Sequence, residues 1–309
     1  MVPINLRTLG SAVLCTIPLW MHAAFADVTL RYQPTLKFGP AAPQQIKDQF
    51  EKSMAGFGQA SLRMKNGKEL SSSGAWSFLI NCTTQQMVMI DNEKQTLAKL
   101  AVADFAEQMS AAMPKPPEMS EEAKKSMPVM KTSIQTNHTG KTESILGIQA
   151  EEREIVITME MSPRPNSGVQ MPPMNLKIVI EAWAAKPDEA LHNQAIRELM
   201  GFKLWTNAFM SPGQMAARIV ANMPGEHGEL AKAVAEMSSG GVLLRTRVIA
   251  QLNENELFEM TQEAVEVSSA AVDEALFQVP AAYREVTPGE VIRSMLEKSM
   301  AAARPNPKP

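Results

Sequence analysis

Few side chains in this chain of 309 residues are of types and spacings that could carry out chemistry. There are four histidines and two cysteines, and none of them stands at metal-ligand spacing from another. His227, in the segment GEHGEL, has glutamates nearby, but a polar helix start has the same composition, and we interpret it as solvated surface. Cys82 has no histidine nearby in the sequence to activate its thiol, so we interpret it as a small core residue. Motifs of phosphate-binding, dinucleotide-binding and serine-hydrolase proteins are missing. The chain is predicted to be non-enzymatic, without catalytic residues, a bound metal or a cofactor.

Methionine is unusually frequent, with 23 copies, and several copies stand in pairs such as MPVM and MPPM. Thioethers are soft ligands that select Cu(I). Copper-binding methionine clusters usually include histidine, however, and neither proline segment contains one, so Cu(I) is predicted to bind weakly. The alternative is that methionine supplies a flexible apolar surface for a ligand or for packing. The methionines of the copper alternative are Met127, Met130, Met171 and Met174.

The N-terminal segment predicts the compartment. Arg7 precedes an apolar run over residues 9–20, and small residues stand at Ala24 and Ala26. This pattern is typical of a secretory signal peptide over residues 1–26, with cleavage between Ala26 and Asp27. We therefore expect a periplasmic or secreted protein.

The sequence after residue 26 argues against a membrane-spanning segment, a disulfide and a nucleic-acid partner. No later segment has the roughly 20 unbroken apolar residues that a membrane helix needs, so the mature chain is predicted to lack a transmembrane segment. Cys82 is the only cysteine after the leader, which excludes an intrachain disulfide. Without residues 1–26, which contain one arginine and no acid, 29 basic and 33 acidic residues remain, and this formal net charge of −4 gives no indication of a nucleic-acid partner.

Alternating apolar residues predict about nine strands joined mainly by short turns, which favours an antiparallel sheet. In AWSFLIN, Trp76, Phe78 and Ile80 share one face. The predicted strands lie near residues 28–32, 60–65, 75–81, 85–90, 96–100, 153–161, 175–185, 241–252 and 255–269.

The stretch QQMVMIDNEKQTLAKL predicts a hairpin whose first strand is apolar on both faces. Asp91 and Asn92 supply turn chemistry. Either Met87 and Met89 or Val88 and Ile90 are expected to face a hollow. The other pair is expected to lie under one of two Pro/Met-rich loops, at residues 113–130 and 162–174.

Helical spacing is confined to three regions. One helix is predicted near residues 102–113. A long helical excursion is predicted over residues 187–239, with apolar stripes such as Leu191, Leu199 and Met237 that need a partner surface. A capping-box pattern, Thr287 with Glu290, predicts a C-terminal helix within residues 287–309, followed by a disordered tail.

Five segments together resemble a family of exported bacterial proteins whose architecture is similar to that of the periplasmic lipoprotein carriers, the LolA/LolB-like fold. The resemblance covers residues 60–286. It implies an α+β fold in which residues 27–286 form one curved antiparallel sheet, a half-barrel, closed by a helical lid. The segments are MIDNEKQTLAKL, TGKTESILGIQAEEREIVI, EAWAAK, GGVLLRTRVI and LFQVPAAYREV.

The half-barrel reading predicts a hollow that binds a hydrophobic ligand, such as a lipid, or an acylated protein partner. Arg245 is placed there as a contact for an anionic head group. The open alternative for Arg245 and Arg247 is pairing with Glu263 or Glu259 on the neighbouring strand. A competing interpretation of the whole chain is a structural or stress-related envelope protein with a closed core. The other candidate ligand-binding residues are Trp76, Phe78, Ile80, Met87 and Met89 in the hollow, with Trp205 and Phe209 on the lid.

Overall fold

The computed structural model describes residues 27–45, 47–48, 51, 59–112, 128–163, 172–201, 232–233, 236–237 and 241–303. Twelve strands and a few helices, most of them short, lie within these residues. The strands are β1 (Val28–Phe38), β2 (Ala60–Lys65), β3 (Lys68–Ser73), β4 (Trp76–Asn81), β5 (Gln86–Asp91), β6 (Thr96–Ala101), β7 (Val129–Ile145), β8 (Ile148–Ser162), β9 (Met174–Ala185), β10 (Leu243–Leu252), β11 (Asn255–Ser268) and β12 (Arg284–Glu285). The helices are η1 (Val102–Asp104), α2 (Phe105–Ala112), α4 (Glu189–His192), α5 (Gln194–Gly201), η2 (Glu274–Phe277) and α9 (Pro288–Ala303).

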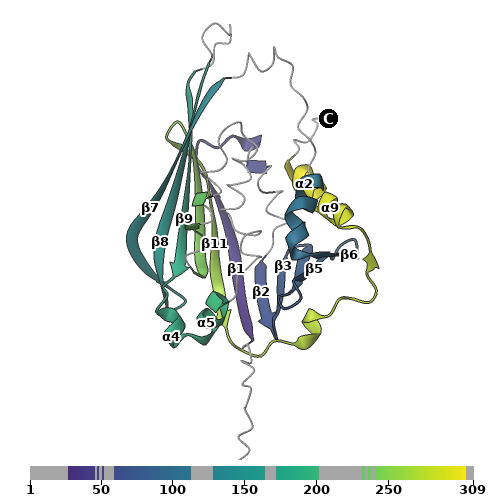
Figure 1. Ribbon diagram of the computed structural model, residues 1–309. Helices are drawn as coiled ribbons and strands as arrows, with labels where there is room; N and C mark the ends of the chain where they lie inside the picture. Colours follow the sequence, from purple (N-terminus) through teal and green to yellow (C-terminus); the bar gives the residue numbers. More distant parts are fainter. Residues whose placement is uncertain are drawn as a thin grey trace, which may run out of the picture.

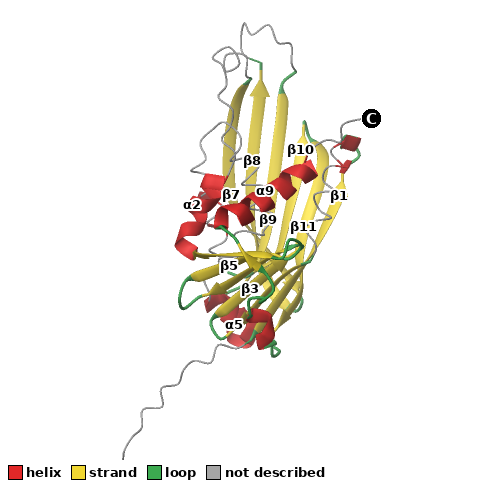
Figure 2. Cartoon of the chain, turned by 90° about the vertical axis from the view of Figure 1, so that its right-hand side faces the viewer, coloured by secondary structure: helices red, strands yellow, loops and turns green. Residues whose placement is uncertain are grey.

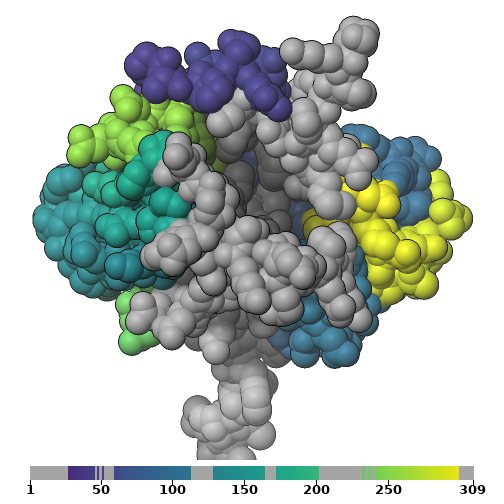
Figure 3. Space-filling model, turned by 90° about the horizontal axis from the view of Figure 1, so that it is seen from above, coloured from purple at the N-terminus to yellow at the C-terminus, as the bar shows by residue number. Residues whose placement is uncertain are grey.

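All twelve strands belong to one open, curved sheet in the order β12-β6-β5-β4-β3-β2-β1-β11-β10-β9-β8-β7 (Figure 1). Neighbouring strands are antiparallel except β12 and β6, which are parallel. The long strands β7 to β11 form one side of the curve, and α2 and α9 cross the face of the short strands on the other side (Figures 1 and 2). Seen from above, these two sides stand opposite one another (Figure 3). The predicted α+β class and curved antiparallel sheet are confirmed.

Turn chemistry explains why the short strands form hairpins. Asn81 ends β4, and its Oδ1 accepts hydrogen bonds from the backbone N–H groups of Thr83 and Thr84, both at 3.0 Å. Asp91 ends β5 and closes the next turn in the same way, as the sequence predicts. Such side-chain bonds satisfy backbone donors that the ladder leaves free, so they set where each strand ends.

Two long or central strands, β3 and β7, are missing from the sequence-based prediction. Strand β3 reads KELSSS, and its inward positions Glu69, Ser71 and Ser73 are polar although they are buried. Strand β7 pairs only with β8 in the described part of the chain, and most of its side chains are exposed. Neither strand therefore shows the apolar alternation by which a strand is recognised.

The sheet buries three main apolar clusters on or around its inner face. The first, the long-strand cluster, is built on β8 to β11 and includes Ala233 and Met237 from the region of the predicted lid. The second lies where α5 packs against the sheet, and the third lies between β4, β5, β6 and the helices α2 and α9. The α9 helix is thus part of the core of this sheet.

The capping-box pattern predicts where α9 begins. Glu290 accepts a hydrogen bond from the backbone N–H of Thr287 at 3.1 Å, and α9 starts at the next residue, Pro288. Val291 and Ile292 are fully buried against the sheet, and the Ser294 hydroxyl donates to Asp91 Oδ2 at 3.0 Å. The C-terminal helix is therefore held both by apolar packing and by a bond to the β5–β6 turn.

The first part of the predicted helical excursion consists of two short helices, α4 and α5, whereas the sequence suggested one helix with a continuous apolar stripe. Asn193 has an extended backbone between α4 and α5, and its Oδ1 accepts from the N–H of Ile196 at 3.1 Å, which is an N-cap. Leu199 is buried, but Leu191 on α4 is 74% exposed. The expectation that Leu191 packs on a partner surface is wrong, because the break at Asn193 ends the helical periodicity between them.

No helix in the described ranges is long and apolar enough to span a membrane.

Candidate functional site

The inner face of the long strands is a continuous apolar surface. Along β8, Ile155, Ile157 and Met159 alternate with outward residues and are at most 1% exposed. The antiparallel register places Ile180 opposite Ile155 and Ile178 opposite Ile157, so the surface extends across neighbouring strands. The same face continues with Val248 and Ala250 on β10 and with Phe258 and Met260 on β11.

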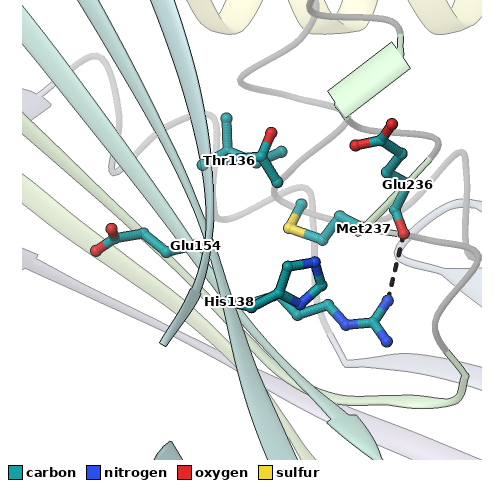
Figure 4. A pocket seen from close by; sticks show the side chains of 7 residues that line it. Thr136, His138, Glu154, Glu236 and Met237 are labelled. Carbon is teal, nitrogen blue, oxygen red and sulfur yellow. Dashed lines mark hydrogen bonds between the residues drawn. The ribbon is translucent and has the colours of Figure 1, made fainter. Parts of the chain in front are cut away.

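A pocket of about 210 Å³ lies at this face, between β7, β8 and residues 236–237. In Figure 4, Thr136, His138 and Met237 converge on it, whereas Glu154 points to the opposite side of the strand. Ile155 and Met237 line the pocket and also belong to the long-strand cluster, so its apolar wall joins the apolar face. The full lining is Thr136, His138, Arg153, Glu154, Ile155, Glu236 and Met237.

Arg153 is the cation of this pocket. It shares the inward side of β8 with Ile155, and the register sets it opposite His138 on β7. Its Nη1 donates to the backbone carbonyl of Glu236 at 3.3 Å, the bond drawn in Figure 4. Its Nε is buried, and no acceptor among the described residues lies within hydrogen-bonding distance. The pocket therefore combines apolar walls with an incompletely bonded guanidinium.

The five apolar residues predicted to line the hollow lie together, but under helices. Phe78, Ile80, Met87 and Met89 are at most 3% exposed and pack with Phe105 of α2 and with α9. The Phe78 and Phe105 rings meet edge to face, with centroids 6.4 Å apart. Trp76 is partly buried at the rim, with Lys298 of α9 above its ring at 5.4 Å. This part of the inner face is filled by the protein's own side chains.

The other face of the β5 strand also has a cover. Val88 packs with Leu79 on β4 and Leu70 on β3, against Val272 and Phe277. These last two residues belong to the segment that follows β11 and includes η2. Among the described residues, the cover of Val88 is thus this segment. Most of the two Pro/Met-rich loops that were expected there, residues 113–127 and 164–171, lies outside the described residues.

Arg245 lies on the outer face of β10, away from the pocket and the long-strand cluster. It bonds Glu263 on β11 at 2.5 Å and Glu143 on β7 at 2.6 Å, and its guanidinium lies 5.2 Å from the centre of the Trp183 ring. These contacts correspond to the pairing alternative, and they place Arg245 outside the inner-face site.

Arg247 follows the same outward row. It bonds Glu259 at 2.8 Å and Glu181 at 3.1 Å. The hydrogen bond from Arg247 lowers the pKa of Glu259 against the effect of burial, and burial raises the pKa of Glu181 although Arg247 opposes it. The positive charge of Arg247 therefore stabilises the negative charges of two carboxylates that are both largely buried.

Trp205 and Phe209, the predicted aromatic contacts of the lid, lie outside the described residues. Of residues 187–239, the structure describes α4, α5 and two short helical pieces at 232–233 and 236–237. Ala233 and Met237 from these pieces are buried in the long-strand cluster.

Neither Cys82 nor the acidic side chains of the described residues form a site suited to nucleophilic or metal chemistry. The Cys82 thiol packs against the α9 cluster, and burial together with the Glu69 charge raises its pKa to about 11. A thiol with so high a pKa is a poor nucleophile at neutral pH. No group of three or more His, Cys, Asp or Glu side chains suited to a metal ion occurs within the described ranges.

Sequence reasoning missed Arg153 and His138, although one signal was present. In REIVITMEM, Arg153 stands two residues before Ile155 and therefore on the apolar side of an alternating strand. A charged residue on that side must meet either a partner or a ligand, because an unpaired charge on an apolar face is costly.

Neither models of known protein families nor curated proteins match this chain, so its function has to be inferred from the geometry of the pocket and the apolar face.

Proposed function

We propose that this protein binds a hydrophobic ligand, a lipid or the acyl chain of a modified protein, on the inner face of the long strands. The observation that carries the proposal is the pocket of about 210 Å³ whose apolar wall, Ile155 and Met237, belongs to the long-strand cluster. Ligand sites are typically concave and mainly apolar, with a few polar groups that orient the ligand. Most residues that line this pocket are polar or charged, and only Ile155 and Met237 are apolar, so the apolar part of the site would come from the adjoining long-strand cluster.

The resemblance to the lipoprotein carriers supports the same reading, with residues 187–239 acting as a helical lid. Ala233 and Met237 are the described residues of that region that pack on the apolar face. Such a lid would separate from the sheet when a ligand enters, because the ligand and these side chains would contact the same surface.

Export to the periplasm is part of the proposal. The signal-peptide pattern ends at Ala26, and Asp27 is already held by the fold. Its Oδ2 bonds Lys65 Nζ and the backbone N–H of Val272, each at 2.7 Å. A mature chain that begins at Asp27 would keep both contacts.

One experiment tests both export and ligand binding. The full-length chain is produced in a Gram-negative bacterium, purified from the periplasm without detergent and weighed by native mass spectrometry. We expect the mass of residues 27–309 plus an excess mass that denaturing solvent releases as lipid. A mass that includes residues 1–26 would contradict the leader. A protein without excess mass that also fails to bind a hydrophobic dye would contradict ligand binding and favour the structural, closed-core alternative.

Cu(I) binding is a second candidate, and the strand register favours it in one respect. Met130 on β7 lies opposite Met161 on β8, which lies opposite Met174 on β9. All three are partly exposed, and directly opposite residues have Cβ atoms about 5 Å apart, so neighbouring thioethers can approach a common soft cation. Of the four predicted methionines, Met127 and Met171 lie outside the described residues.

The copper candidate is tested by anaerobic competition with a chromogenic Cu(I) chelator. Because neither Pro/Met-rich segment contains a histidine in its sequence, we expect a weak site that the chelator empties when it is present in excess. If the row binds Cu(I), the triple variant Met130→Leu, Met161→Leu, Met174→Leu loses that binding, whereas the control Met109→Leu, Met295→Leu keeps it. Equal binding by both variants would exclude the row as the site.

A further inference from the structure

We propose that the pocket between β7, β8 and residues 236–237 binds the anionic head group of an amphiphile, with Arg153 as its main contact. The inference rests on the proposed binding of a hydrophobic ligand and adds the chemical class of that ligand. The head group would be a carboxylate or a phosphate, and the alkyl chain would follow the apolar face beyond Ile155 and Met237.

Arg153 differs from the outward-facing arginines in the groups that contact its guanidinium. Arg245 and Arg247 each contact two carboxylates. Among the described residues, Arg153 has no carboxylate within ion-pairing distance, and the hydrogen bond that it makes to them goes to a neutral backbone carbonyl. Since its Nε is buried without an acceptor, an anionic oxygen in the pocket would complete the bonding of this guanidinium.

The groups around Arg153 also favour an anion. His138 faces the pocket in Figure 4 and can supply a second N–H donor. Two carboxylates line the pocket, but neither pairs with Arg153. Glu154 points to the other side of the strand in Figure 4 and accepts a bond from Asn137 at 2.8 Å. The Glu236 carboxylate lies 3.9 Å from Lys232 Nζ.

The size of the pocket sets how much of the ligand it can contain. At roughly 30 Å³ for each water-sized group, a volume of about 210 Å³ holds roughly seven such groups. That accommodates a carboxylate or phosphate and the first few methylenes, but not a long alkyl chain. The remainder of the alkyl chain needs the apolar face next to Ile155. That face is buried in this structure, so the side chains that cover it, Met237 and Ala233 among them, would have to move away when the ligand binds.

The inference is tested by isothermal titration calorimetry with four ligands of equal chain length: dodecanoate, dodecyl phosphate, dodecanol and dodecyltrimethylammonium. The proteins are the wild type, Arg153→Met, Arg153→Lys and the control Arg284→Met. Arg284 is an exposed arginine on β12, at the opposite edge of the sheet from β7. Thermal unfolding of each variant checks that the fold is kept.

We expect the wild type and Arg284→Met to bind one or both anionic ligands at least tenfold more tightly than dodecanol. Arg153→Met should lose that preference while it still binds dodecanol, because one charge-assisted hydrogen bond accounts for about a factor of ten. Arg153→Lys should keep part of the preference. A carboxylate-binding and a phosphate-binding protein are separated by which anionic ligand is preferred.

One set of results would contradict only the head-group inference, and another would contradict the proposed function as well. Equal affinities for all four ligands, or an anion preference that Arg153→Met retains, would overturn the head-group inference while leaving the hydrophobic-ligand function in place. Failure of the wild type to bind any of the four would overturn the proposed function and the head-group inference with it.

Discussion

Replacing Asp91 with alanine should lower the free energy of unfolding by about 3 kcal/mol. The carboxylate is fully buried, and its Oδ1 accepts from the backbone N–H groups of Glu93 and Lys94 at 3.1 and 3.0 Å. Its Oδ2 accepts from the Ser294 hydroxyl, which joins α9 to the β5–β6 turn. Each hydrogen bond to a charged group is worth about 1.5–3 kcal/mol, and the three are not additive. The variant leaves two backbone donors and one hydroxyl without this acceptor.

Urea unfolding of two further variants shows how much of the lost free energy of unfolding comes from the turn and how much from the bond to α9. Asp91→Asn keeps an acceptor for the turn and should cost clearly less than Asp91→Ala. Ser294→Ala removes only the bond to α9 and should cost about 1 kcal/mol. If Ser294→Ala destabilised the protein as much as Asp91→Ala, the turn would contribute nothing, contrary to the role assigned to Asp91.

Replacing Arg247 with methionine should lower the free energy of unfolding at pH 7 by about 2 kcal/mol. The side chains of Glu181 and Glu259 are only 13% and 15% exposed, and Arg247 bonds both. Breaking a buried ion pair typically costs about 3–5 kcal/mol. We expect less here because Arg247 itself is 36% exposed and water screens part of the interaction.

The loss should depend on pH in a defined direction. Because Arg247 lowers the pKa of Glu259 in the folded state, the stabilisation from Glu259 is present above the ordinary carboxyl pKa of 4.5 and is lost as the pH falls through the lowered folded-state value. Burial raises the pKa of Glu181, and removing Arg247 would raise it further. The variant should therefore be most deficient near neutral pH and approach the wild type in acid, where both carboxylates are protonated.

Arg31→Met is the matched control for this prediction. Arg31 pairs with Glu266 across β1 and β11, but the two side chains are 42% and 36% exposed. Exposed pairs contribute about 0–1 kcal/mol, so this variant should be nearly as stable as the wild type. Equal losses for Arg31→Met and Arg247→Met, measured by urea unfolding at pH 7, would show that burial of the carboxylates does not govern the effect.

Local patterns in the sequence predicted much of the architecture. Trp76, Phe78 and Ile80 do share a face, because side chains alternate strictly along a strand wherever it pairs. The Asp91 turn and the start of α9 after Thr287 were also predictable, since their hydrogen bonds join residues only two or three positions apart. These features depend on neighbours in the chain, so a single sequence contains the information that they need.

Strands without apolar alternation were not predictable in this way. The inward residues of β3 are polar and buried, and β7 is mostly exposed. Each strand is defined by its pairing with a distant or adjacent partner and not by its own periodicity. Propensity and pattern lose their value where backbone pairing alone sets the conformation.

The sequence by itself determined which residues of each strand share a face, where several turns close and where the C-terminal helix begins. Only the tertiary structure decided which face is the inner one and what covers it. It placed Arg245 outward beside Glu143 and Glu263, placed α2 and α9 over Met87 and Met89, and left Arg153 inward at the pocket. The physical reason is that a period of two is the same for both faces of a strand. The choice between the faces comes from strand register, sheet curvature and contacts between residues far apart in the chain.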